Sequence, residues 1–259
     1  MSRFGFLFLM EFEMNKSLSV VALLSLTFAG QAIAQDATDA GWYVGVDIGE
    51  ALSHDGEARF EGTTVDTYGA LPNFELDDSN VVIGGVVGYD FAGPLRAGVE
   101  VRNRDFDTAG GYLAATGNLA GDFAALKGEV ESTTLMLTGY YDFNAIGNVQ
   151  PYAKAGLGAA FNNASATSSY GYNNPIWAGT SVDGTTVTGV SYPGDSNTEL
   201  AWEVGGGLAM PLTDRLLLDV GYQYVDAGES ETGVNSDGDL VRFDDLAAHE
   251  ATLGLRFKF

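Results

Sequence analysis

Cysteine is absent from the 259-residue sequence. This absence excludes a disulfide framework, and it also excludes a lipid anchor attached through cysteine. Proline is scarce, with six residues, whereas glycine is abundant, with 35. A chain of this composition is better suited to many strands and turns than to helices.

Basic residues are also few. Twelve Lys and Arg stand against 35 Asp and Glu, which gives a formal net charge of -23. We therefore expect no nucleic-acid partner, because a protein that binds the phosphate backbone needs a basic surface. Histidine occurs only twice, so a hydrolytic Ser-His-Asp triad has few places to form.

The amino terminus carries the three parts of a cleaved secretory signal. Lys16 is followed by an apolar run at residues 18–28 and by Ala-Ile-Ala at residues 32–34. The apolar run is too short for a spanning helix. We predict that residues 1–34 are a signal peptide and that residues 35–259 form one exported domain. Acidic residues before the signal suggest that translation starts at Met14.

Short runs of alternating apolar and polar residues follow the signal. In the clearest run, Leu95, Ala97, Val99 and Val101 alternate with Arg96, Gly98, Glu100 and Arg102. Successive side chains lie on opposite faces of a strand, so this pattern predicts a β-strand with one apolar face. Eight such runs occupy residues 42–49, 81–91, 95–102, 132–143, 153–161, 199–208, 215–224 and 248–259.

The connections between these runs alternate between short and long. Short turns lie at residues 92–94, 144–148 and 211–214, and long links at 53–80, 105–128, 162–198 and 226–246. Outer-membrane barrels have short periplasmic turns and long external loops, whereas a secreted β-sandwich, the alternative, has no need of this sorting. We predict an all-β fold, a transmembrane eight-stranded antiparallel up-and-down barrel in the outer membrane of a Gram-negative cell.

Aromatic residues gather at the ends of the predicted strands. Near the short turns these are Trp42, Tyr89, Phe91, Tyr141, Phe143, Phe257 and Phe259, and near the long links Phe106, Phe161, Trp202, Tyr222 and Tyr224. Two such belts predict the two membrane interfaces. The terminal Phe259 resembles the signal by which the barrel-assembly machinery recognises its substrates, and we expect that machinery as a partner.

Four motifs carry a family resemblance: residues 137–143 (LTGYYDF), Pro-Tyr at 151–152 with Gly-Leu-Gly at 156–158, residues 218–224 (LDVGYQY) and residues 253–259 (LGLRFKF). Their order and spacing resemble the small eight-stranded surface barrels of Gram-negative bacteria, the outer-membrane protein A-like and opacity-type porin family. The resemblance covers essentially the whole exported domain. Since nothing follows Phe259, we expect no peptidoglycan-binding domain.

The polar phase of the strands predicts a charged barrel interior. It contains Asp47, Glu100, Arg102, Lys154, Glu203, Asp219 and Arg256, together with Arg96, Arg215 and Lys258. An eight-stranded barrel is just wide enough for its side chains, and unpaired charge there is costly. We expect Arg256 to reach Asp219 and Asp47, and Lys154 to reach Glu203. The alternative is a narrow channel for small solutes, lined by the same charges.

His54 and His249 are predicted at the external rim, on neighbouring strands. Asp55, Asp244, Asp245 and Glu250 are expected nearby, and imidazole with carboxylates suits zinc. Isolated rim histidines are the simpler interpretation, and we expect no metal site. Residues 235–239 resemble a calcium loop only in part, because the glycine is misplaced and no closing glutamate follows. We expect no cofactor.

We also expect no enzymatic activity. Lipid A deacylases use a histidine and a serine two residues apart, but Ala251 follows His249 at that distance. Residues 162–198 are rich in small polar residues and contain Tyr170, Tyr172, Trp177 and Tyr192, a composition that can bind ligands. A turn at residues 182–185 suggests that the fifth and sixth strands project beyond the bilayer.

The predicted function is therefore an envelope structural or surface-interaction role through acidic external loops. Membrane lipid and lipopolysaccharide are the expected surroundings, and an extracellular ligand or surface is the expected partner of the loops.

Overall fold

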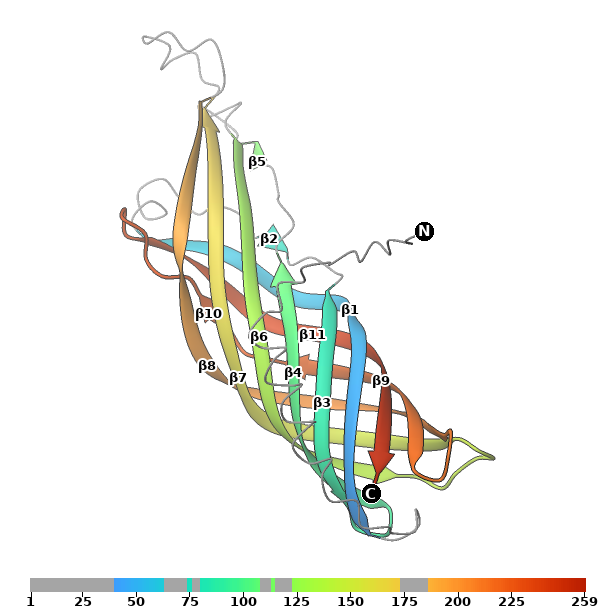
Figure 1. Cartoon of the computed structure of the whole chain (residues 1–259). Helices are drawn as coiled ribbons and strands as arrows, with labels where there is room; N and C mark the ends of the chain where they lie inside the picture. Colours follow the sequence, from blue (N-terminus) through green and yellow to red (C-terminus); the bar gives the residue numbers. More distant parts are fainter. Residues whose placement is uncertain (1–39, 63–73, 76–79, 108–112, 115–122, 173–185) are drawn as a thin grey trace, which may run out of the picture.

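A computed structural model describes residues 40–62, 74–75, 80–107, 113–114, 123–172 and 186–259. All of its regular elements are strands of one antiparallel sheet (Figure 1). The long strands are β1 (Gly41–Gly62), β3 (Val81–Asp90), β4 (Leu95–Asp107), β6 (Phe123–Asp142), β7 (Gln150–Tyr172), β8 (Thr186–Pro211), β9 (Leu216–Asp226) and β11 (Asp239–Lys258). The short strands are β2 (Phe74–Glu75), β5 (Leu113–Ala114) and β10 (Ser230–Glu231). The predicted signal peptide lies outside the described residues and stays a prediction.

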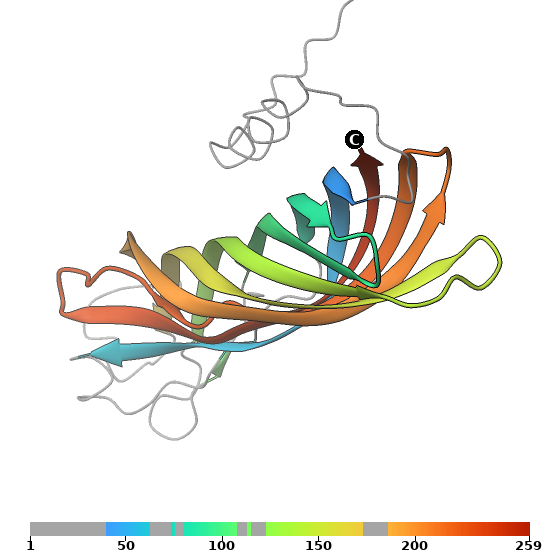
Figure 2. The same ribbon diagram turned by 90° about the horizontal axis from the view of Figure 1, so that it is seen from below.

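The eight long strands close into a ring. Each pairs with its neighbours in the order β1, β3, β4, β6, β7, β8, β9 and β11, and β11 pairs with β1. At the closing seam the backbone N–H of Phe259 donates to the Trp42 carbonyl oxygen at 3.0 Å. Figure 2 shows the curvature of the sheet and the carboxy terminus beside the start of β1. The predicted eight-stranded antiparallel barrel is confirmed.

Apolar side chains face outward along the lower part of the ring. Val99, Leu137, Leu157 and Leu253 are all exposed on the outer surface, which is the arrangement expected where lipid replaces a protein core. No helix in the described ranges is long and apolar enough to cross a membrane.

The membrane band ends where the outward residues become polar. On β4 the change comes after Val101, because Asn103 and Asp105 occupy the next outward positions. On the neighbouring β6 it comes between Leu135 and Thr133. Segments beyond these points lie outside the membrane-spanning part of the strands.

Five strands are much longer than a bilayer requires. β1, β6, β7, β8 and β11 contain 22, 20, 23, 26 and 20 residues, whereas about 9–11 tilted residues span a membrane. Figure 1 shows β6, β7 and β8 continuing well past the ends of β3 and β4. The prediction that the fifth and sixth strands project is confirmed, but the turn at 182–185 lies outside the described residues.

The expectation of long external loops is therefore wrong for much of these segments, which are strands. The reason is an apolar core between the projecting strands. It lies above the charged interior, and we call it the second core. It includes Phe60, Phe106, Leu126, Val130, Phe243 and Leu246, all buried. Tyr192 also belongs to this core, since it is 3% exposed and its ring centroid lies 5.9 Å from that of Phe60. Tyr192 is thus not a surface-binding residue.

Candidate functional site

The charged interior begins at the periplasmic end with an aromatic cage around Arg96. Its guanidinium donates to both carboxylate oxygens of Asp142, at 2.6 and 2.8 Å. The same group lies 4.3 Å from the ring centroid of Tyr140, 5.4 Å from that of Tyr43 and 5.5 Å from that of Tyr152. Charge pairing and cation–π contact together compensate the desolvation of this arginine.

Glycines on the interior phase make room for two of these rings. A Cβ at Gly88 would lie 2.3 Å from the Tyr43 hydroxyl, and one at Gly207 would lie 2.6 Å from the Tyr152 hydroxyl. Any larger residue at either position would displace the ring opposite. The abundance of glycine in these strands therefore has a packing cause.

Glu100 is the centre of the middle layer, because three side chains donate to its carboxylate. It accepts hydrogen bonds from Lys154 at 3.0 Å, from Arg102 at 3.2 Å and from the Tyr140 hydroxyl. Lys154 also lies 3.1 Å from Glu203. Each buried charge in this layer has at least one opposite charge within hydrogen-bond distance, as a low-dielectric interior requires.

The remaining predicted pairs are divided between two acids. Arg256 donates to Asp219 at 3.2 Å, whereas Asp47 is bound by Arg102 at 2.6 Å. The expected contact of Arg256 with Asp47 is absent from the ion pairs of the described chain. The reason is that Arg102 approaches Asp47 from the other side, across the intervening strand β3.

The most deeply buried pair was not predicted. Arg104 Nε donates to Glu250 at 2.6 Å, and Gln223 donates to the other oxygen of Glu250 at 2.6 Å. Side-chain exposure is 1% for Arg104 and 0% for Glu250. Arg104 lies on the same inward face of β4 as Arg96 and Arg102. The alternation of this strand therefore predicts that Arg104 faces the interior.

Two rim or interior expectations are corrected, and a third agrees with the structure. Glu250 faces the interior and not the rim, because it lies on the same inward face of β11 as Arg256. Arg215 lies in the turn before β9 and is only half-buried, outside the ion-pair network. Lys258 does lie inside, with its ammonium 2.7 Å from Asp90.

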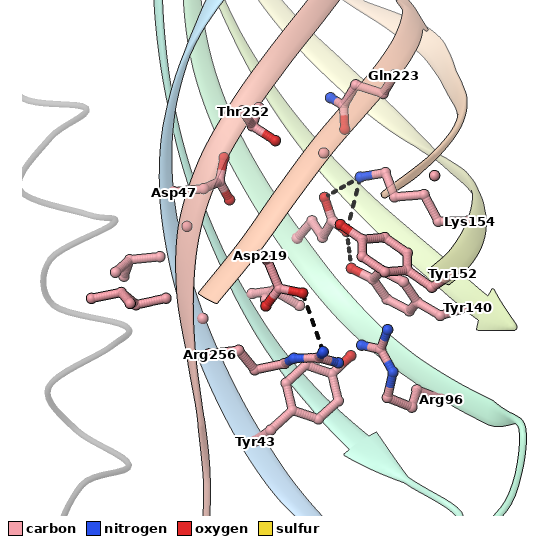
Figure 3. A pocket seen from close by; sticks show the side chains of 18 of the residues that line it. Tyr43, Asp47, Arg96, Tyr140, Tyr152, Lys154, Asp219, Gln223, Thr252 and Arg256 are labelled. Carbon is pink, nitrogen blue, oxygen red and sulfur yellow. Dashed lines mark hydrogen bonds and ion pairs between the residues drawn. The ribbon is translucent and has the colours of Figure 1, made fainter. Parts of the chain in front are cut away.

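A small cavity remains between the lower and middle layers. Its water-accessible space is about 60 Å³ and it is lined by Tyr43, Asp47, Arg96, Tyr152, Asp219 and Arg256 (Figure 3). The Tyr43 hydroxyl and Arg256 Nε face no protein partner there. The volume suits about four water molecules, which would satisfy both groups.

The two histidines lie on neighbouring strands, as the sequence suggests. His54 pairs in register with Ala248, next to the pair of Ser53 with His249. His249 faces outward, and its Nδ1 lies 2.7 Å from the Tyr222 hydroxyl. The side chain of His54 is outside the described residues. No cluster of three or more His, Asp or Glu able to hold a metal occurs in the described ranges.

An acidic strip lies on the outside, beyond the membrane band. Asp105 is directly opposite Glu131, and Asp107 is opposite Glu129. Burial, and then repulsion by these neighbouring carboxylates, raises the pKa of Asp105 to about 6. Like charges directly opposite one another destabilise a strand pair, so this strip is held in place by the rest of the sheet.

A second acidic surface lies on the projecting parts of β1, β10 and β11. Arg242 bridges Glu61 at 3.2 Å and Glu231 at 2.9 Å. Arg59 lies 3.0 Å from Asp244, and burial raises the pKa of Asp244 despite this arginine. In the calcium-like segment, the Asn235 side chain accepts from the backbone N–H of Asp237 and Asp239, both at 2.9 Å.

Comparison with known proteins agrees with this architecture. The outer membrane protein PagN of Salmonella typhimurium is 29% identical over 192 residues, 67% of this chain and 74% of PagN. A candidate adhesin of Rickettsia bellii is 24% identical over 250 residues, 93% of this chain and 99% of that protein. The solved structure of OprG from Pseudomonas aeruginosa covers 85% of this chain and 97% of its own, with 18% identity and a TM-score of 0.47.

A family model described as the outer membrane protein beta-barrel domain matches residues 20–259. That range contains every strand of the ring. The protein therefore belongs to the outer membrane protein beta-barrel domain family and resides in the outer membrane of a Gram-negative bacterium.

Proposed function

We propose that this protein is a non-enzymatic surface-interaction barrel, in which a rigid extension carries acidic binding surfaces away from the membrane. The observation that supports it best is the second core. Phe60, Tyr192, Phe106 and Phe243 pack together beyond the membrane band. A chain that only needed to close its strands would not require an apolar core outside the bilayer.

The charge of the extension indicates the kind of partner. Its two acidic surfaces favour a basic partner through long-range attraction, which steers encounter and weakens with salt. The relatives support a role at the cell surface, since one of them is named as a candidate adhesin. Enzymatic activity has no support in the interior, where the charged groups are paired with one another and enclosed by the barrel wall.

Bacteria that display the full chain test this proposal. The acidic strip is neutralised by amide replacement of Asp105, Asp107, Glu129 and Glu131, and adhesion to cultured animal cells and to polylysine-coated beads is counted. We expect adhesion to fall by about tenfold, and adhesion of the unmodified chain to fall as salt increases. The control is Asp214→Asn, which removes an exposed carboxylate from a periplasmic turn. Equal adhesion of both variants and the unmodified chain would refute the proposal.

We further propose that the last strand mediates assembly by the barrel-assembly machinery. Phe259 stacks on Phe257 with ring centroids 5.4 Å apart, and its backbone closes the ring. Phe259→Ala should slow insertion, measured as the heat-dependent gel shift after pulse labelling. Phe91→Ala, another exposed aromatic at the periplasmic end, is the control and should insert at the normal rate.

A further inference from the structure

Four aromatic side chains form a continuous row on the outside of the barrel, at the extracellular end of the membrane band. They are Trp202 of β8, Tyr224 and Tyr222 of β9, and His249 of β11. Successive ring centroids lie 5.4 Å apart for Trp202 and Tyr224, 4.9 Å for Tyr224 and His249, and 5.9 Å for His249 and Tyr222. We call this row the aromatic platform.

Hydrogen bonds fix the platform although it is exposed. Trp202 Nε1 donates to Asp226 at 3.0 Å, and the other oxygen of Asp226 accepts from the Gly228 N–H at 2.9 Å. At the opposite end, the Tyr222 hydroxyl is bonded to His249. Exposure is nevertheless 38% for Trp202 and 51% for Tyr222. Ordering exposed side chains costs conformational entropy. An unspecific membrane anchor does not need ordered side chains, so we infer that the platform is preorganised for a ligand.

The position of the platform indicates an amphiphilic ligand. Below it, the outward phase of β9 continues with Val220 and Leu218. Above it, the same phase ends on the carboxylate of Asp226. A lipid whose acyl chains lie along β9 would therefore place its headgroup on the four rings, at the depth where Trp and Tyr meet the headgroup region.

The chemistry of the platform favours a sugar headgroup. Flat ring faces can stack on the C–H face of a sugar, and Asp226, His249 and Tyr222 offer hydrogen-bond partners to hydroxyl groups. A phosphate would instead meet the negative charge of Asp226, and none of the platform side chains carries a permanent positive charge. We propose that the aromatic platform binds a sugar ring of a glycolipid in the outer leaflet. This inference does not depend on the adhesive function proposed above.

Trp42 provides a matched control at the other membrane interface. It also faces outward, is 58% exposed and contacts a tyrosine ring, Tyr89, at 5.4 Å. Its hydrogen-bonding surroundings differ, because no counterpart of the Asp226 contact is found for Trp42 in the described chain. If the loss of an interfacial aromatic ring acts on lipid binding only in a general way, substitution of Trp42 and substitution of Trp202 should have equal effects.

The first experiment measures lipid retention. The full chain is folded in amine-oxide detergent, which carries no sugar, and mixed with equal amounts of deep-rough lipopolysaccharide and phosphatidylethanolamine. Lipid that stays bound after gel filtration is quantified by mass spectrometry. We expect a preference for the lipopolysaccharide, and a loss of about fivefold in Trp202→Leu with Tyr222→Leu. Trp42→Leu should retain the normal amount. Equal retention of both lipids, or an equal loss in the control, would overturn the inference.

The second experiment does not depend on large substitutions. A chain with Trp42→Phe and Trp177→Phe has Trp202 as its one tryptophan, and the heat-dependent gel shift verifies that it is folded. Adding the sugar detergent dodecyl maltoside should change the emission of Trp202 in a saturable way, whereas an alkyl phosphocholine should not. Identical responses to both detergents would show unspecific contact and would overturn the inference.

Discussion

At the scale of single residues, Arg104 and Glu250 are the strongest test of the charged interior. Removing one partner of a buried pair leaves an uncompensated charge, which costs about 3–5 kcal/mol. We therefore predict that Glu250→Leu destabilises the folded barrel by this amount, measured by urea unfolding in detergent micelles. Gln223, which also donates to Glu250, would lose its acceptor at the same time.

The double variant separates charge from packing. Arg104→Met combined with Glu250→Leu removes both charges, and replacing a whole buried pair by apolar residues is often neutral. Most of the lost stability should return. If the double variant were as unstable as the single one, lost packing and not the unpaired charge would be the cause of the destabilisation.

Asp105 predicts a pH dependence. Its pKa in the folded state is about 6, above the value near 3.9 of an unfolded chain. Between these two values the folded state binds the proton first, so stability gains as pH falls through 6 towards 4 and is reduced above 6. Asp105→Asn should therefore be more stable than the unmodified chain at pH 8, by at most about 1 kcal/mol because the side chain is half exposed to screening solvent.

Unfolding curves at pH 8, 6 and 4 measure this effect. The advantage of Asp105→Asn should shrink as the pH falls. Asp214→Asn, in an exposed periplasmic turn, is the control and should leave the pH profile unchanged. A pH-independent advantage would mean that removal of charge is not the cause.

At the scale of elements, the projecting strands should behave as a separate layer of stability. Tyr192→Ala removes a large side chain from the second core, and such changes cost about 3–5 kcal/mol. Proteinase K added to intact cells should then cut the extension, while the membrane part keeps its heat-dependent gel shift. Val234→Ala, which is exposed, should stay resistant. Loss of the gel shift in Tyr192→Ala would show that extension and barrel unfold as one unit.

At the scale of the whole molecule, the interior predicts a closed barrel. Ion pairs of Arg102, Lys154 and Arg96 cross the lower half, and the second core fills the space above. Planar-bilayer recordings should therefore show no large, steady channels. Such channels in the unmodified protein would favour the alternative of a small-solute pore.

Much of this architecture was predictable from local patterns. Alternation in β4, from Leu95 to Arg102, fixes which side chains face lipid, because the period of a strand is two. The pair of Lys154 with Glu203 followed from strand order alone. The pair of Asp47 with Arg102 did not, since these strands are separated by β3, and the distance across a barrel depends on its curvature and tilt.

The sequence by itself determined the eight strands, their inward and outward faces and the outer-membrane location, because these depend on period, spacing and family motifs. Only the tertiary structure decided where the strands end, since Phe60 and Tyr192 are far apart in the chain and extend the sheet only when packed together. The aromatic platform was decided in the same way. Its four rings come from three strands, and register alone brings them into contact.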